Sequence, residues 1–538
     1  MTKKQATILS ALTLLALVLT VMVSRRLWFR LDLTKGKSYT ISAVSRNLHN
    51  EIPDQVRITY FLSDKLRAIH PIPGEIEDLL KEYTAYSRGK IRLTVKDPAK
   101  ANAAGEVEQF GIMPQQIQTV EQDQASLITV YSGLLIEYLD EIDVMPSVFS
   151  LETLEYDLTS RIRSMVRGSS RMLGVVLGDN FRRWNEDYRQ LQGAFMQAGY
   201  QLRLIPPGAD IADTVPALLV LGGVEGLDET ALYQIDRYLQ TGGRALFTVK
   251  GVRVETSGDL EGRLLDDQGL LAMLSSYGVT VLPEIVMDRS ALTMQYQTRS
   301  PNGMIQIRMT RNPQWIRVLR ENSNPDHPVS AHFTGLDMYW ASPLSLNAPE
   351  GVEAGRLFTT TADAWSMREP YNVNPEIPYL LERDSSETRG RKILGASLAG
   401  VFPSWFAGIP KPWQEEGELP DMPFEPKAGR IIVVGDTEFA TSFISVSGGQ
   451  RNLDFLVQAA DWLGNDDDII GIRSRESGSG RLDRIIEPEK RAAAMRTAQA
   501  VNVFIVPLLV VLAGIAIALR RRARGAAARS ARGGEKEQ

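Results

Sequence analysis

The distribution of apolar residues predicts a helix that could span a membrane near each end of the chain. An uncharged, strongly apolar stretch begins at Ile8, and a second one runs from Val501 to Leu519. A membrane-spanning helix needs about 20 predominantly apolar residues, and basic residues next to both stretches are typical of its ends. We therefore expect transmembrane helices at residues 8–24 and 501–519, with a cleaved signal peptide as the alternative interpretation of the first.

The charges beside these stretches predict an orientation. The tail at residues 520–538 is rich in arginine, and basic flanks favour the cytoplasmic side of a membrane. We expect a protein of the inner (cytoplasmic) membrane with both termini, residues 1–7 and 520–538, in the cytoplasm. The bulk of the chain would then be extracytoplasmic, in the periplasm. Arg25 and Arg26 oppose this orientation, but long translocated domains follow the charge bias weakly.

After the first stretch, the hydrophobic period changes along the chain in a way that predicts a small α/β domain. Residues 56–62 alternate as a strand does, residues 74–87 carry apolar side chains at helical spacing, and residues 91–95 form a second strand pattern. This order is typical of a βαβ unit. A hairpin is expected around Ser132-Gly133, and a helix over residues 154–166 is expected to close the domain.

The second half of the chain has the pattern of a doubly wound α/β domain. Apolar strand patterns that begin at Met172, Ala217 and Arg244 alternate with amphipathic helix patterns. Such an order is typical of a parallel sheet with helices on both faces. A later strand pattern, residues 430–434, is predicted to join the same sheet after a long insertion at about residues 283–427.

This insertion is rich in proline and holds five of the eight tryptophans of the chain. The favoured interpretation is an irregular cap whose aromatic side chains supply packing area. The alternative is an aromatic groove for a sugar or a lipid, formed by Trp340, Trp365 and Trp405.

Small and acidic residues follow the predicted parallel strands. In a doubly wound sheet, ligands bind in the crevice beyond the carboxyl ends of the strands. Glycine lets a ligand approach the backbone, and a carboxylate accepts hydrogen bonds from hydroxyl groups, so this rim would suit a polyol. The same residues also end strands as turns and caps, and no histidine or lysine partner is evident for the acids. The candidate rim residues are Gly178, Asp179, Asn180, Gly222, Gly223, Gly435, Asp436 and Glu438.

Composition narrows the functional classes. The 538 residues have room for about three domains and carry a formal net charge of −5, which argues against a nucleic-acid binder. The chain has no cysteine and only four histidines, so thiol chemistry is excluded and no metal site is assigned. It contains neither a GxxxxGK[ST] nor a GxSxG motif. We therefore expect no catalytic residue and no cofactor.

Two further segments have alternative interpretations. Residues 448–452 precede a predicted helix and could hold an anion at its N-terminus, although a loop capped by Asn452 is the commoner arrangement. The polar residues 474–500 are expected to form a tether next to the second apolar stretch, and the tether could transmit a conformational signal.

Several segments, taken in order, resemble the GldG-like auxiliary proteins of ABC-type transport systems. They include LDLTKGKSYTIS from Leu31, VRITYFLS from Val56, LLAMLSSYGVTV from Leu270 and VVGDTEFA from Val433. Each segment is modest alone, but the series covers most of the chain between the two apolar stretches. The resemblance implies an auxiliary component of a membrane complex that contains an ABC ATPase and a permease. Relatives in gliding bacteria belong to the motility apparatus.

The resemblance also implies a fold. The central domain is similar to class I glutamine-amidotransferase-like (flavodoxin-like) domains, whose nucleophile is a cysteine that this chain lacks. The expected fold class is thus α/β and membrane-anchored: a small N-terminal α/β domain, an amidotransferase-like domain with a long Pro/Trp-rich insertion, and one transmembrane helix at each end. The expected order is a cytoplasmic N-terminus (1–7), a transmembrane helix (8–24), an N-terminal extracytoplasmic domain (25–168), the amidotransferase-like domain (171–473), a tether (474–500), a second transmembrane helix (501–519) and a basic tail (520–538).

The expected function is a non-enzymatic auxiliary subunit with a large extracytoplasmic body that binds a ligand or an envelope protein. Expected partners are the ABC permease and ATPase, and a saccharide or lipid could be a ligand. A membrane-anchored saccharide- or lipid-binding module is one alternative. Another is an anchored hydrolase that uses Asp179, Asp436 or Glu438, and a purely structural scaffold is a third.

Overall fold

The computed structural model describes residues 41–464 and residue 472, apart from several internal gaps. All described residues lie in one compact unit, residues 39–477. The gaps are residues 101–102, 122–123, 152–153, 169–170, 181, 256–260, 266, 268, 300–303, 331–332, 372, 374–387, 410–420 and 424.

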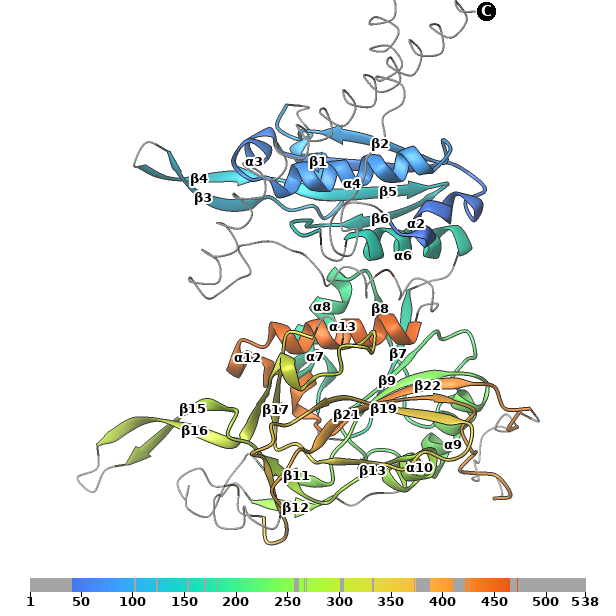
Figure 1. Ribbon diagram of the computed structural model, residues 1–538, viewed down its shortest axis with the longest axis vertical. Helices are drawn as coiled ribbons and strands as arrows, with labels where there is room; N and C mark the ends of the chain where they lie inside the picture. The colour runs from blue at the N-terminus through green and yellow to red at the C-terminus, as the bar shows by residue number, and fades with distance from the viewer. Residues whose placement is uncertain are drawn as a thin grey trace, which may run out of the picture. The chain divides into compact units, whose positions relative to one another are not determined.

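The first part of the described chain is a four-stranded sheet in the order β2-β1-β5-β6 (Figure 1). β1 (Val56–Leu62) pairs in parallel with β2 (Ile91–Lys96), and α4 (Ile72–Tyr86) connects them. This confirms the predicted βαβ unit. Apolar residues at helical spacing, Ile76, Leu80 and Tyr83, bury one face of α4.

The same sheet corrects the predicted hairpin around Ser132-Gly133. β4 (Gln124–Val130) pairs with β3 (Gln115–Glu121), whereas residues 132–133 lie inside β5 and pair with β1. A Cβ at Gly133 would lie 2.6 Å from a methyl carbon of Ile112, so the glycine allows close packing within a strand and does not form a turn.

The remaining elements of this first part are α2 (Ala43–Asn47), η1 (Leu48–Asn50), α3 (Asp64–Ile69), α5 (Ala104–Gln109), β5 (Ser132–Tyr138), β6 (Glu141–Met145) and α6 (Leu154–Arg167).

The larger part is built on a nine-stranded sheet in the order β13-β18-β21-β22-β10-β9-β7-β8, with β19 also paired to β21. The five strands from β22 to β8 are mutually parallel. The later strand predicted at residues 430–434 is therefore confirmed as a neighbour of β10. The strands are β7 (Met172–Leu177), β8 (Gln201–Leu204), β9 (Leu218–Leu221), β10 (Arg244–Thr248), β13 (Val279–Val281), β18 (Leu344–Leu346), β19 (Val352–Thr359), β21 (Ile393–Gly400) and β22 (Gly429–Val434).

Two hydrophobic cores cover the two faces of this sheet. On β9, Leu219 and Leu221 face the core that contains α8 and α13, while Leu218 and Val220 face the core that contains α9 and α10. Because alternate side chains of a strand point to opposite faces, strands buried on both sides must be apolar throughout. The helices of this part are α7 (Trp184–Asp187), α8 (Arg189–Gln197), α9 (Glu229–Gln240), α10 (Leu270–Tyr277), α12 (Ile444–Ser447) and α13 (Gln450–Gly464), with the 3-10 turns η2 (Arg320–Asn322) and η3 (Glu438–Ala440).

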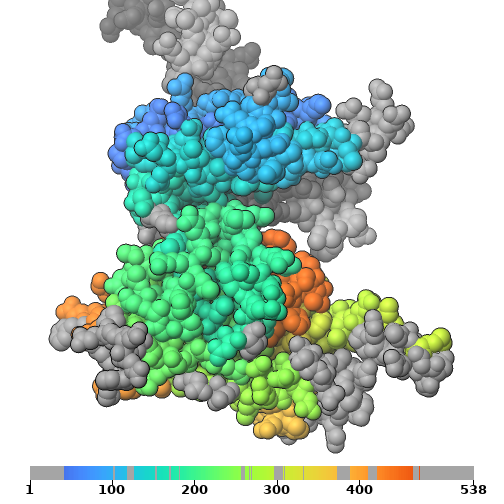
Figure 2. All heavy atoms as spheres, turned by 180° about the vertical axis from the view of Figure 1, so that it is seen from behind, coloured from blue at the N-terminus to red at the C-terminus, as the bar shows by residue number. Residues whose placement is uncertain are grey.

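The insertion at residues 283–427 contains regular β-strands, whereas an irregular cap was expected. Its strands β18, β19 and β21 extend the main sheet with antiparallel pairing, so the cap interpretation is wrong for these strands. A two-stranded ribbon of β15 and β16 extends outward from the sheet in both views (Figures 1 and 2). The remaining strands are β11 (Val252–Val254), β12 (Gly262–Leu264), β14 (Ile285–Met287), β15 (Ala291–Arg299), β16 (Ile305–Val318), β17 (Leu336–Tyr339) and β20 (Trp365–Met367).

The predicted fold class is corrected in one respect, the transmembrane helix at each end. Within the described ranges, no helix is both long enough and apolar enough to cross a membrane. The longest helices there, α4 and α13, have 15 residues each, which corresponds to about 23 Å against about 30 Å of hydrocarbon. The predicted spans at residues 8–24 and 501–519 lie outside the described residues, as does the predicted tether. The fold class that the structure supports is α/β alone.

Candidate functional site

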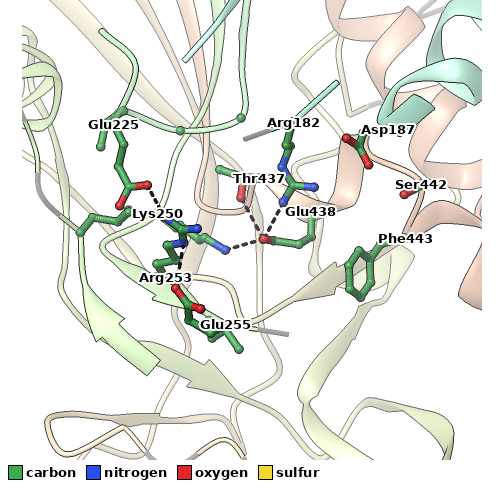
Figure 3. Close-up of a pocket in the computed structure, with 15 residues that line it drawn as sticks. Arg182, Asp187, Glu225, Lys250, Arg253, Glu255, Thr437, Glu438, Ser442 and Phe443 are labelled. Carbon is green, nitrogen blue, oxygen red and sulfur yellow. Dashed lines mark hydrogen bonds and ion pairs between the residues drawn. The ribbon is translucent and has the colours of Figure 1, made fainter. Parts of the chain in front are cut away.

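A pocket of about 300 Å³ lies where the parallel strands β7, β9, β10 and β22 end (Figure 3). The loops that follow these strands supply most of its wall, so the pocket occupies the crevice in which doubly wound proteins bind ligands. Its lining residues are Arg182, Asp187, Gly222, Gly223, Val224, Glu225, Lys250, Arg253, Val254, Glu255, Leu265, Thr437, Glu438, Ser442 and Phe443.

Glu438 is the centre of the charged groups in this pocket. One of its carboxylate oxygens accepts hydrogen bonds from Lys250 Nζ at 2.6 Å and from Arg182 Nη2 at 2.9 Å (Figure 3). The other oxygen accepts a hydrogen bond from the Thr437 hydroxyl at 2.9 Å. The side chains of Glu438, Lys250 and Arg182 are only 6%, 5% and 12% exposed. Burial alone would raise the pKa of Glu438, but the two cations overcome this effect and hold the pKa at about 2.

Asp436, which follows β22 in the chain, ties the end of that strand to β17. Its two carboxylate oxygens accept hydrogen bonds from the backbone N–H groups of Tyr339 and Glu438, both at 2.7 Å. The side chain is fully buried. Burial raises the pKa of Asp436 well above its ordinary value, and the neighbouring charge of Glu438 raises it further. This predicted rim residue therefore organises the loop and is not among the residues that line the pocket.

A second carboxylate, Asp179, positions Arg182. Its Oδ1 accepts the backbone N–H of Arg182 at 2.8 Å, and its Oδ2 lies 3.5 Å from Arg182 Nε. Asp179 thus fixes the arginine that reaches Glu438. Asn180, next in the chain, is exposed and does not line the pocket.

The rim glycines are explained mainly by close packing of the loops. A Cβ at Gly178 would lie 2.0 Å from the carbonyl oxygen of Gly223, and one at Gly435 would lie 2.1 Å from that of Ser342. A Cβ at Gly222 would lie 2.1 Å from Asp179 Oδ2. Only Gly222 and Gly223 of these glycines line the pocket, and both have positive φ values, of 91° and 106°.

The structure thus brings Gly222, Gly223 and Glu438 of the predicted rim to the pocket wall. That these residues bind a ligand stays a prediction. The expectation that the acids have no histidine or lysine partner is wrong, because Lys250 contacts Glu438, and Arg182 contacts it as well. Lys250 could have been found from the sequence, since it follows β10 at the carboxyl end of a predicted strand.

The three tryptophans of the predicted aromatic groove lie in three different hydrophobic clusters. Trp340 packs with Trp315 and Phe443, Trp365 packs with Met287, and Trp405 packs against the core that contains α9 and α10. The structure therefore does not bring them together as one groove.

The predicted loop at residues 448–452 is shorter than expected, because α13 already begins at Gln450 and Asn452 lies in its first turn, where its side chain has a structural role. Its side-chain amide accepts the backbone N–H of Asp337 at 2.9 Å and donates to the carbonyl oxygens of Asp337 and Phe439 at 2.8 and 2.9 Å. The fully buried side chain therefore clamps α13 to β17. Across the described residues, no group of three or more potential ligand side chains could hold a metal ion.

The structure and its pocket define an α/β protein with a charged crevice at the carboxyl ends of its parallel strands. The chain belongs to the family described as an ABC-type uncharacterized transport system, whose model matches residues 170–469. Membership supports an auxiliary, non-enzymatic role and an association with an ABC transporter. The matched residues include the whole pocket. A domain of unknown function, DUF7088, matches residues 35–137.

Similarity to a natural relative extends over nearly the whole chain. An uncharacterized protein of Borreliella burgdorferi is 24% identical over 506 residues, which cover 92% of this chain and 94% of that protein. Among solved structures, the mmIFT52 N-terminal domain is 13% identical with a TM-score of 0.32, and covers 55% of this chain and 98% of its own. A ThuA-like protein from Parabacteroides merdae is 10% identical with a TM-score of 0.26, and covers 55% and 90%. Likenesses this weak carry no argument about fold or function, so the amidotransferase-like assignment gains no support from them.

Proposed function

We propose that this protein is a GldG-like, non-enzymatic auxiliary subunit that binds the ATPase and permease of an ABC-type transport complex. Its α/β body would be extracytoplasmic and would recognise a ligand or an envelope protein through the pocket around Glu438. The observation that carries the proposal is that the family match at residues 170–469 contains this pocket and the whole nine-stranded sheet.

The charges of the pocket support binding over catalysis. A general base works best with a pKa near the operating pH, whereas Lys250 and Arg182 hold the pKa of Glu438 at about 2. Both oxygens of Asp436 are engaged by backbone N–H groups, and its carboxyl group is fully buried. Asp436 and Glu438 are two of the three acids named for the hydrolase alternative, and their environments fit structural and binding roles; the third, Asp179, contacts Arg182.

Affinity purification of the tagged full chain from detergent-solubilised membranes tests the proposal. We expect co-purification of an ABC ATPase and a multi-span permease, in amounts absent from a parallel purification with the untagged chain. A chain recovered without these partners, and with hydrolytic activity that Glu438→Gln abolishes, would overturn it.

The location and the cellular role need separate experiments. Protease added to intact spheroplasts should cleave the α/β body if that body is extracytoplasmic, while a cytoplasmic marker stays intact. If the GldG-like character extends to gliding motility, deletion of the gene should stop surface translocation, and the full chain should restore it.

A further inference from the structure

The charged groups that line the pocket are almost balanced, and most of them are already paired with one another. Three cationic side chains face four carboxylates across the lining. Arg182 and Lys250 pair with Glu438, and Arg253 Nη1 lies 2.6 Å from Glu225 Oε2 (Figure 3). An anionic ligand would add negative charge to a site that has no excess of cations. A cationic ligand would find most of the carboxylates already paired with Arg182, Lys250 and Arg253, so an uncharged ligand fits best.

Lys250 offers the clearest sign that a polar ligand belongs in this pocket. An ammonium group has three N–H donors, and in the described part of the chain Glu438 is the hydrogen-bond partner found for Lys250. The side chain is nevertheless 95% buried and lines the pocket. Two buried donors therefore need acceptors from within the pocket, and hydroxyl oxygens supply them without bringing a charge.

One wall of the pocket is aromatic. Phe443 lines the cavity, and its ring packs against Tyr339 and Trp340 at centroid distances of 5.3 and 5.6 Å. These neighbours hold the ring in place. The negative π-face of an aromatic ring attracts the weakly positive C–H groups of a sugar ring or cyclic polyol.

We propose that the pocket binds an uncharged, hydroxyl-rich small molecule of monosaccharide or cyclic-polyol size. Lys250 and Glu438 hydrogen-bond to its hydroxyl groups, and Phe443 packs against its C–H face. The volume of about 300 Å³ is at the lower end of the range for small-molecule sites, which fits a ligand of this size. This inference rests on the proposed function because it identifies what the auxiliary subunit would recognise.

Calorimetric titration of the full-length protein with three sets of probes tests the ligand class. The neutral set is D-glucose, D-mannose, D-galactose and myo-inositol, the anionic set is inorganic phosphate and D-gluconate, and the cationic probe is putrescine. We expect at least one neutral probe to bind with a stoichiometry of one. Binding confined to the charged probes, or the absence of binding by every probe, would overturn the proposal.

Three variants test the residues. Lys250→Met and Phe443→Leu should each weaken binding of the neutral probe by at least about tenfold. Lys427→Met, at an exposed lysine of the same domain, should leave it unchanged. Thermal unfolding checks that each variant is folded. If Lys250→Met does not fold, Phe443→Leu still tests the site, because it changes no charged residue. Unchanged affinity in folded Lys250→Met and Phe443→Leu would contradict the assignment.

The purification described above separates the two proposals. Recovery of the ATPase and permease without binding of a neutral probe would overturn the ligand class and leave the auxiliary role standing. Binding of a neutral probe by a chain that purifies without these partners would overturn the auxiliary role alone.

Discussion

Lys250 Nζ donates a hydrogen bond to Glu438 Oε1 over 2.6 Å, and both side chains are almost completely buried. The two residues come from the loops after neighbouring parallel strands, β10 and β22. Arg182, from the loop after β7, makes a second contact to the same carboxylate oxygen. Because buried charges are costly unless they are paired, this contact joins three loops of the crevice and holds the pocket open in a defined shape.

Glu438→Gln should destabilise the protein by about 3–5 kcal/mol, because it leaves two buried cations without their carboxylate. Chemical denaturation of the full chain, followed by tryptophan fluorescence, measures this loss. The matched control is Glu137→Gln, which removes the carboxylate of the exposed Arg57–Glu137 pair. That change should cost less than about 1 kcal/mol. Equal losses of stability in the two variants would show that the buried cluster stabilises the protein no more than an exposed ion pair does.

The same cluster predicts a loss of stability in acid. The pKa of Glu438 is lowered from its ordinary value of 4.5 to about 2, so the folded state binds its proton less readily than the unfolded state does. The stabilisation is therefore complete above pH 4.5 and is lost as the pH falls towards 2. Unfolding measured between pH 6 and pH 2 should show a steeper decline in the wild type than in Glu438→Gln. Parallel curves would contradict the assigned pKa.

Asp436 affects the pH dependence of stability in the opposite direction to Glu438. Burial raises its pKa well above the ordinary value of 3.8, so its contribution to stability is complete below that value and declines as the pH rises through the folded pKa. Asp436→Asn should remove this component, and the difference in stability between variant and wild type should change with pH above 4. A difference independent of pH would mean that Asp436 is ionised in the folded protein.

Local sequence patterns could predict the strands and the edge of the sheet at which the pocket lies, since these depend on hydrophobic period and chain order. Val56–Leu62 was predicted as a strand and is β1, and Glu438 was correctly placed near the carboxyl ends of the strands. Partners distant in sequence could not be predicted in this way. Arg182 and Glu438 are 256 residues apart, and nothing in either local pattern indicates the other.

The strands added by the insertion were missed for a different reason. β21 reads ILGASLAG, in which glycine, alanine and serine weaken the strand signal. Small side chains are nevertheless required there, because a Cβ at Gly395 would lie 2.4 Å from the ring of Phe358 on the paired strand β19. Packing between strands that are distant in sequence determines which residue is favoured at this position. The strand propensity of the local sequence gives no information about that packing.

Asp236 on α9 should be among the most sensitive buried positions. Its carboxylate accepts hydrogen bonds from Tyr277 Oη at 2.6 Å, Ser404 Oγ at 2.7 Å, Gln240 Nε2 at 3.0 Å and the Phe406 backbone N–H at 3.2 Å. Asp236→Ala leaves several buried donors without an acceptor, each costing about 1–3 kcal/mol. Thermal or denaturant unfolding should show a loss of at least about 3 kcal/mol. Asp213→Ala, at a largely exposed carboxylate, is the control and should change stability by less than about 1 kcal/mol.

Gly222 and Gly223 provide a matched pair that separates backbone strain from steric overlap at the pocket wall. Both have positive φ values, so alanine at either position adds strain of about 1–2 kcal/mol. At Gly223 the nearest neighbour of a new Cβ is Thr437 Cγ2 at 3.7 Å, an ordinary contact. At Gly222 the new Cβ would lie 2.1 Å from Asp179 Oδ2 and would displace the carboxylate that positions Arg182. Gly222→Ala should therefore lower the unfolding free energy by clearly more than Gly223→Ala does, and it alone should disturb the Arg182–Glu438 pair. Equal losses would mean that Asp179 moves away without cost and does not hold Arg182 in place.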